Sequence, residues 1–222
     1  MRWGSSSLTW VRPLRGLLCV FDGKVVSFSY AGIDASNRTQ GHRFLAPTPF
    51  EVHHFKDYEK KMREHFVILD WQERRQIVKA GVAKVAGELT PLKDESLLDE
   101  VTGLVEWPVA LKGKVDGHFM NLPLEVITTP MRVHQRYFPL MDGQGKLAPV
   151  FGLMANVEAS DQGKAIVIGN ERVLRARLAD AQFFWEQDQK HPLEHFNVSL
   201  KTRLFHQHLG SVFSKVERLV HL

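Results

Sequence analysis

The segment from residue 169 to residue 185 constrains this chain most, because its apolar residues repeat with the period of an α-helix. They recur at spacings of four, three and four, which places them on one helix face. The residues of this stripe are Leu174, Leu178, Ala181 and Trp185. The pattern predicts a helix with one packed face, and it predicts that Trp185 belongs to the core.

Three arginines of the same segment lie outside the stripe. Arg172, Arg175 and Arg177 form a local cationic patch, and Glu171 and Asp180 are the only acidic residues nearby. One interpretation is a solvated helix face with pairs four residues apart, such as Glu171 with Arg175. The other is a surface that binds phosphate, with all three arginines free to face a partner. The spacing alone leaves both interpretations open.

The segment from Asn170 to Trp185 resembles a signature of the beta subunit of the bacterial heterotetrameric glycyl-tRNA synthetase. Further blocks that agree with this family, in the same order, are Met1-Arg2-Trp3-Gly4, Val11-Arg12-Pro13, Gly41-His42-Arg43-Phe44-Leu45-Ala46-Pro47, Glu100-Val101-Thr102-Gly103-Leu104-Val105-Glu106-Trp107-Pro108-Val109, His134-Gln135-Arg136-Tyr137-Phe138-Pro139 and Leu209-Gly210. The resemblance covers essentially the whole chain and implies an internal piece of a longer subunit. The family's N-terminal region should precede it, and an HD-like domain and an anticodon-binding domain should follow it.

Strand signals dominate the first part of the chain and helix signals the last part, which predicts an α+β fold. We expect a mixed or antiparallel sheet domain over residues 1–160 and a C-terminal helical extension over residues 161–222. The family resemblance implies that the sheet domain is similar to the B3/B4 module of the phenylalanyl-tRNA synthetase. It also implies that the extension is a connector toward an HD-like domain that is absent from this chain.

Turn residues and prolines predict where the strands begin and end. Asp22-Gly23 between two β-prone runs predicts a hairpin, and Pro13 before it marks an extended or helix-starting segment. Pro108 indicates that the apolar run around it forms an edge strand or contains a bulge. Residues 135–141 and 147–156 predict two strands joined by a turn.

Capping residues predict where the helices begin. Asp70, with a glutamate three residues later, has the pattern of a capping box, and Asp94 is expected to cap a short helix. From Asp161 onward the chain is predicted to be helical almost to its end. Breaks are expected near Gly169 and at residues 190–192, where a proline follows a lysine and a histidine.

Composition limits the compartment and the partners. Residues 1–56 carry a net charge of +4, residues 57–163 of −3 and residues 164–222 of +3, which permits a polyanionic partner without requiring one. The one cysteine, Cys19, excludes an internal disulfide, fits a reducing compartment and is predicted to be a buried strand residue. No apolar run is long enough to span a membrane. We expect a cytoplasmic protein with no membrane and no DNA partner, and we expect Trp107 to be a core residue.

Two further polar groupings have two interpretations each. His134 and Arg136, beside Tyr137 and Phe138, could stack on unpaired RNA bases and bind phosphate. Alternatively the segment is a strand with one of its aromatic rings in the core and Arg136 outside. In the strand-like block of residues 41–47, His42 and Arg43 could contact phosphate or could cap and connect loops.

No motif for catalysis or metal binding is present in the sequence. The glycines near Lys146 lack the spacing of a phosphate loop, and the 11 histidines lack the spacing of a zinc site. No histidine is followed by aspartate, so the HD metal motif is absent too. We expect no catalytic residue, no metal ligand and no cofactor site in this chain.

The family resemblance implies the role. The whole enzyme would use ATP and Mg²⁺ to join glycine to tRNA(Gly), with catalysis in the alpha subunit, and this chain would support tRNA binding and assembly. The candidate tRNA-binding residues are His42, Arg43, His134, Arg136, Arg172, Arg175 and Arg177. One alternative is post-transfer editing, by analogy with the phenylalanyl module, although a pocket that fits only glycine weakens the need for it. The other is a pure scaffold between subunits.

Overall fold

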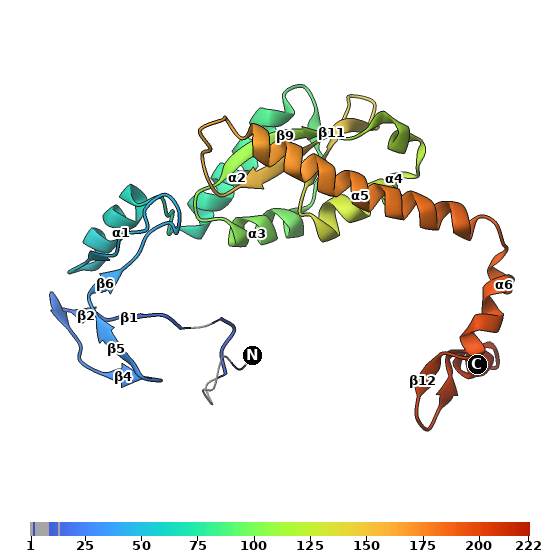
Figure 1. The fold of residues 1–222 in the computed structure, drawn as a ribbon, viewed down its shortest axis with the longest axis horizontal. Helices are drawn as coiled ribbons and strands as arrows, with labels where there is room; N and C mark the ends of the chain where they lie inside the picture. The colour runs from blue at the N-terminus through green and yellow to red at the C-terminus, as the bar shows by residue number, and fades with distance from the viewer. Residues whose placement is uncertain (1, 3–8, 13) are drawn as a thin grey trace.

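The computed structural model describes residues 2, 9–12 and 14–222. Pro13 and most of the family block at residues 1–4 lie outside the described residues, so the prediction made for Pro13 is not addressed. Figure 1 shows a central unit of sheet and helices, a set of short strands before it and a small α/β segment after it.

A small lobe of two-to-four-residue strands precedes the central unit. Its strands are β1 (Leu17–Leu18), β2 (Val20–Phe21), β3 (Lys24–Val25), β4 (Ser29–Tyr30), β5 (Ile33–Ser36), β6 (Arg38–Thr39) and β7 (Phe50–Glu51). Asp22 and Gly23 both have positive φ, 48° and 74°, and join β2 to antiparallel β3. Two left-handed residues are what a tight two-residue hairpin turn requires, so the predicted hairpin is confirmed. Cys19 lies between β1 and β2 and is only half-buried, which corrects its prediction as a buried strand residue.

The central sheet has four antiparallel strands in the order β8-β10-β11-β9. They are β8 (Thr90–Pro91), β9 (Val109–Lys114), β10 (Phe138–Met141) and β11 (Leu147–Ala155). The predicted strand pair corresponds to β10 and β11, and β9 is an edge strand, as Pro108 indicated. The expectation of an α+β fold with an antiparallel sheet is thereby confirmed.

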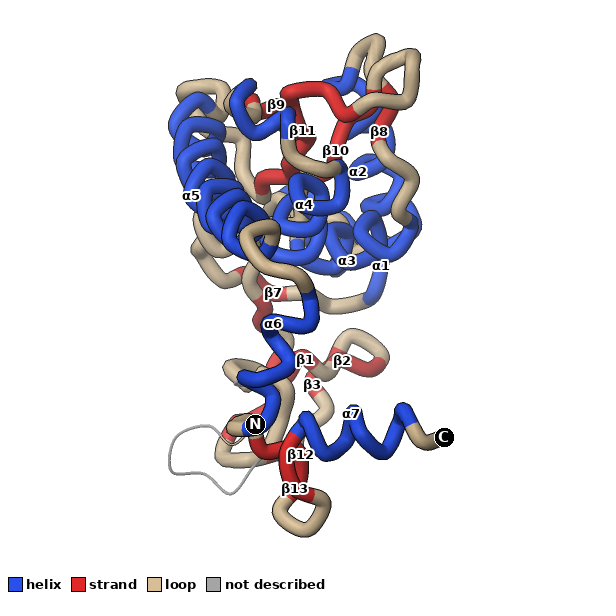
Figure 2. Tube along the Cα trace, turned by 90° about the vertical axis from the view of Figure 1, so that its right-hand side faces the viewer, coloured by secondary structure: helices blue, strands red, loops and turns tan. Residues whose placement is uncertain are grey.

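Helices cover both faces of this sheet, as Figure 2 shows. On one face α2 (Trp71–Ala86) and α3 (Glu95–Leu104) pack around Val82, Leu98 and Phe138. On the other face the 25-residue α5 (Lys164–Asp188) and α4 (Leu124–Thr129) pack around a second core cluster, together with a 3₁₀ turn (Gly117–Asn121). A further helix, α1 (Phe55–Glu64), connects the small lobe to α2.

The predicted helix caps are confirmed. The carboxylate of Asp70 accepts a hydrogen bond from the Glu73 N–H at 2.6 Å, and Asp94 accepts one from the Leu97 N–H at 2.9 Å. Each carboxylate satisfies a backbone donor that the first turn of a helix leaves unpaired. These two aspartates therefore fix where α2 and α3 begin.

The C-terminal part differs from the prediction in two ways. No break occurs near Gly169, because α5 runs through it, and a single interior glycine costs only about 1 kcal/mol when packing holds the helix. After α6 (Leu193–Asn197) and a 3₁₀ turn (Val198–Lys201), the chain forms an antiparallel hairpin before α7 (Val212–Val220). The hairpin strands are β12 (Leu204–His206) and β13 (Gly210–Ser211). The predicted break at residues 190–192 is confirmed.

Neither predicted core tryptophan is buried. Trp107 and Trp185 are both half-buried, and Trp107 packs edge-on against Phe66 with ring centroids 5.3 Å apart. The buried residues of α5 are Leu174 and Leu178, which join the core cluster on that face. The first half of the helix stripe is thus packed, whereas its far end extends past the sheet (Figure 1). The division of the chain at residues 160 and 161 stays a prediction.

Candidate nucleic-acid interface

The start of α5 is fixed by Asp161, which precedes it. The carboxylate accepts hydrogen bonds from the Ala165 N–H at 2.8 Å and the Gly163 N–H at 2.9 Å. The bond from Ala165 is the main cause that lowers the pKa of Asp161. Gly163 has a φ of 81°, and a Cβ at this position would lie 2.8 Å from the side chain of Leu111. Asp161 and Gly163 together set the position from which α5 presents its arginines.

Arg175 is paired within the protein. Its Nε donates to Asp116 Oδ2 at 2.5 Å, and its Nη2 donates to Asp116 Oδ1 at 3.3 Å. The hydrogen bond from Arg175 is the main cause that lowers the pKa of Asp116, and the same pair raises the pKa of Arg175. The expectation that all three arginines are free to face a partner is therefore wrong for Arg175.

Arg172 and Arg177 are exposed, and neither has an ion pair within the described part of the chain. They are five residues apart, which places them about 140° from each other around the helix axis at 3.6 residues per turn. Arg172 lies about opposite the buried stripe of Leu174 and Leu178, and Arg177 flanks that stripe. The predicted patch is thus two separate cations rather than one continuous surface.

The segment at residues 134–138 agrees only in part with its structural alternative, because the strand begins at Phe138 and both aromatic rings, rather than one, lie in the core. Tyr137 and Phe138 are both buried, on opposite faces of the sheet. The Tyr137 ring stacks on Phe151 at 4.5 Å, and its hydroxyl donates to Asn170 Oδ1 at 2.6 Å. Burial raises the pKa of Tyr137 to about 12. Neither ring is available to stack on an RNA base, which corrects the RNA-stacking interpretation.

Of the polar members of this segment, His134 is the last residue of a single turn of π-helix, Pro130–His134, and Arg136 follows that turn. Arg136 has a φ of 60°, and its Nε lies 2.6 Å from Glu100 Oε1. Arg132 pairs with the N-capping carboxylate of Asp94. His134 is exposed. A π-turn and a left-handed residue in succession are local irregularities of a kind often found at functional sites.

His42 and Arg43 have different environments in a turn rather than in the predicted strand. His42 is 1% exposed, and its Nδ1 accepts hydrogen bonds from the Phe44 N–H at 3.2 Å and the Leu45 N–H at 3.1 Å. These bonds cap the turn, so the geometry favours the capping interpretation for His42. Arg43 is exposed and its guanidinium lies 5.6 Å from the centre of the Phe44 ring.

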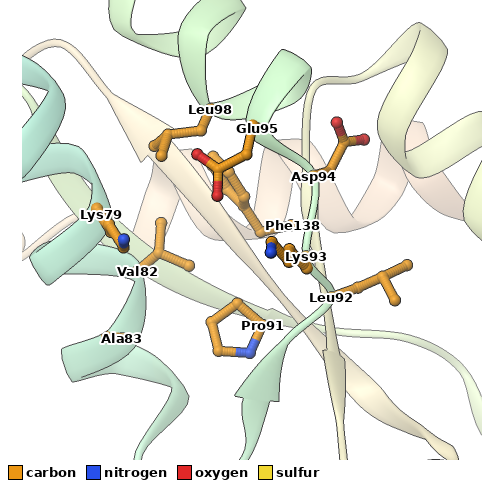
Figure 3. A pocket seen from close by; sticks show the side chains of 10 residues that line it. All are labelled: Lys79, Val82, Ala83, Pro91, Leu92, Lys93, Asp94, Glu95, Leu98 and Phe138. Atoms are coloured by element: carbon orange, nitrogen blue, oxygen red, sulfur yellow. The ribbon is translucent and has the colours of Figure 1, made fainter.

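A pocket of about 330 Å³ lies between α2, α3 and the segment that follows β8 (Figure 3). Its lining residues are Lys79, Val82, Ala83, Pro91, Leu92, Lys93, Asp94, Glu95, Leu98 and Phe138. The sequence did not predict it, because no local spacing relates residues that come from α2, α3 and β10. The Arg175–Asp116 pair was missed for the same reason, since its members are 59 positions apart. The cap at Asp94 is the only one of these features with a local signal.

The described residues contain neither a metal-binding cluster nor a membrane-spanning helix. No group of three or more histidine, cysteine, aspartate or glutamate side chains in this part of the chain is placed to hold a metal ion. Within the same residues no helix has the length and apolar character to cross a membrane.

Comparison with known proteins identifies the family. The family model described as "Glycyl-tRNA synthetase beta subunit" matches residues 1–222. A glycine--tRNA ligase beta subunit from Rhodospirillum centenum is 47% identical over 245 residues, which cover 99% of this chain and 34% of that protein. Its counterparts from Phenylobacterium zucineum and Geotalea uraniireducens are 47% and 44% identical over 97% and 98% of this chain. The chain spans about a third of the length of these relatives. It therefore belongs to the family of glycyl-tRNA synthetase beta subunits.

Proposed function

We propose that this chain is part of a glycine–tRNA ligase and supports tRNA binding and assembly with the alpha subunit. The alpha subunit would carry out the ATP- and Mg²⁺-dependent joining of glycine to tRNA(Gly), in the cytoplasm. The observation that carries the proposal is the family match over all 222 residues. The chain itself would hold no cofactor.

Three exposed cations support the tRNA-binding part of the proposal. Arg43, Arg172 and Arg177 have no ion pair among the described residues, so their charge is available to phosphates. Arginine side chains that neutralise phosphates release counterions, and the binding constant then falls as salt rises. Arg136 and Arg175 already bind carboxylates, and a phosphate would have to compete with Glu100 or Asp116.

A salt titration of tRNA binding tests this part of the proposal. We expect Arg172→Ala and Arg177→Ala, introduced together into the assembled enzyme, to weaken tRNA binding without lowering the unfolding temperature. The slope of log K against log salt should become shallower by about one to two units, about one for each lost phosphate contact. Arg175→Ala is the matched control, because it removes an arginine from the same helix that is already paired. An unchanged slope in the double variant would count against tRNA contact by α5.

The finer architecture is also part of the proposal. We propose that residues 1–160, which hold the four-stranded sheet, correspond to the B3/B4 module of the phenylalanyl-tRNA synthetase, with residues 161–222 as a connector whose first helix, α5, packs on that sheet. The antiparallel sheet covered by helices supports this proposal. Superposition of the sheet on a solved phenylalanyl module tests it, and a different strand order there would contradict it.

A further inference from the structure

The pocket beside β8 has an apolar floor and a charged mouth. Its floor consists of Val82, Leu98 and Phe138, all of which belong to the core between α2, α3 and the sheet. Because β8 is a two-residue edge strand, no further strand in the described part of the chain closes the pocket on that side. In the view of Figure 3 the side chain of Lys79 lies next to Val82 and that of Glu95 next to Leu98. The core of the sheet unit is thus reachable from the surface at this point.

The four charged side chains at the mouth do not cancel one another. Asp94 is paired with Arg132, whereas Glu95 shares Arg75 with Asp99: Arg75 Nη2 lies 2.5 Å from Glu95 Oε2, and Arg75 Nε lies 2.5 Å from Asp99 Oδ1. Lys79 and Lys93 are exposed, and neither has an ion pair within the described residues. The two unpaired lysines exceed the one carboxylate charge that the shared Arg75 leaves uncompensated, so the mouth keeps a net positive charge above an apolar floor.

The floor and walls distinguish between two kinds of occupant. A nucleobase carries polar edges, and burying them without hydrogen bonds costs free energy. The floor offers no side-chain donor, Pro91 has no N–H, and the Leu92 N–H is already bonded to the Pro139 carbonyl at 2.9 Å. An aliphatic or aromatic protein side chain gives up no hydrogen bond when it enters such a site. Carboxylates beside it would form ion pairs with the two lysines.

We propose that this pocket docks the other subunit of the synthetase, through a large apolar side chain flanked by acidic residues. The inference rests on the proposed function, because it takes the partner from the role of this family as one subunit of an assembly. The chemistry of the pocket supports it, since the apolar floor accepts an apolar side chain and the net positive rim attracts carboxylates. The cavity of about 330 Å³ is at the lower end of the range for ligand pockets, which suits one anchoring side chain rather than a large cofactor.

Two variants of the full-length beta subunit test the proposal independently. Lys79→Glu with Lys93→Glu reverses the charge of the mouth, and Ala83→Trp fills the pocket from an exposed position of α2. Each is expected to weaken association with the alpha subunit by about tenfold or more, as measured by titration in analytical ultracentrifugation. Lys84→Glu is the matched control, because Lys84 is also exposed on α2 but does not line the pocket. It should change the affinity less than twofold.

Parallel measurement of tRNA binding separates this proposal from the proposed function. We expect the charge-reversed variant to retain normal tRNA affinity at matched subunit saturation. Unchanged subunit affinity in both variants would overturn the proposal, and the proposed tRNA role would be unaffected. Loss of tRNA binding with intact assembly would also overturn it, because the lysines would then serve RNA. If Ala83→Trp does not fold, the outcome rests on the charge-reversed pair, whose side chains are exposed.

Discussion

Arg175 binds Asp116 through two hydrogen bonds, and this pair joins α5 to the chain that leaves β9. One turn earlier on the same helix, Glu171 Oε1 accepts a hydrogen bond from the Lys114 N–H at 2.8 Å. Both contacts fasten the helix to the end of the edge strand. One member of the cationic patch expected from the sequence, Arg175, therefore helps to hold α5 against its own sheet.

The first prediction follows from the lowered pKa of Asp116. A carboxylate whose pKa is depressed in the folded state contributes stability above its unfolded pKa of about 3.9, and this stability is lost as the pH falls through the folded value. Arg175→Ala should therefore lower the unfolding temperature slightly at pH 7, and the difference from the parent should disappear at low pH. Arg172→Ala, which removes an unpaired arginine, should show no such difference. An equal difference at pH 3 and pH 7 would contradict the assignment.

The second prediction concerns the buried hydroxyl of Tyr137. It donates to Asn170 Oδ1, while Asn170 Nδ2 donates to the Ile166 carbonyl at 2.7 Å. Tyr137→Phe leaves the amide oxygen without its donor and should lower the free energy of unfolding by about 1 kcal/mol. Urea denaturation measures this change. Tyr30→Phe is the control, because Tyr30 is 51% exposed and should change stability little.

The third prediction uses the close approach of two strands. A Cβ on Gly113 would lie 2.5 Å from Cζ of Phe151, and the Phe151 ring is fully buried. Gly113→Ala should therefore destabilise the protein by about 1–3 kcal/mol, the usual cost of overpacking a core. In Gly143→Ala the added methyl group meets no atom within 4 Å, so thermal unfolding should stay near that of the parent. Equal unfolding temperatures for the two variants would show that the ring can move aside.

Local signals were sufficient for the helix starts and the tight turn. Asp70, Asp94 and the pair Asp22-Gly23 act through bonds or dihedral angles within three residues, so the sequence predicts them directly. The antiparallel pairing of β10 and β11 followed in the same way from a short turn. The two caps and the β10–β11 pair belong to the sheet unit, whereas the Asp22-Gly23 turn belongs to the small lobe.

Features that depend on distant contacts could not be predicted in this way. The stripe of α5 continues to Trp185, but only Leu174 and Leu178 reach the core, because the sheet does not extend along the whole helix. The sequence shows the period of the stripe and does not show the length of the surface that it covers. Similarly, the net charge of the pocket mouth depends on Arg75 and Arg132, which do not line the pocket but form ion pairs with its carboxylates.

The last prediction concerns hydrolysis of mischarged tRNA. A general base needs a second group that orients its ring, and no hydrogen bond orients the exposed His134 within the described residues. An enzyme for the smallest amino acid can also exclude larger amino acids by size, so a separate editing step would add little to its specificity. We expect the assembled enzyme to deacylate alanyl-tRNA and seryl-tRNA no faster than buffer does. Turnover that disappears in His134→Ala, but persists in the surface control His53→Ala, would contradict this prediction and would assign His134 to an editing site.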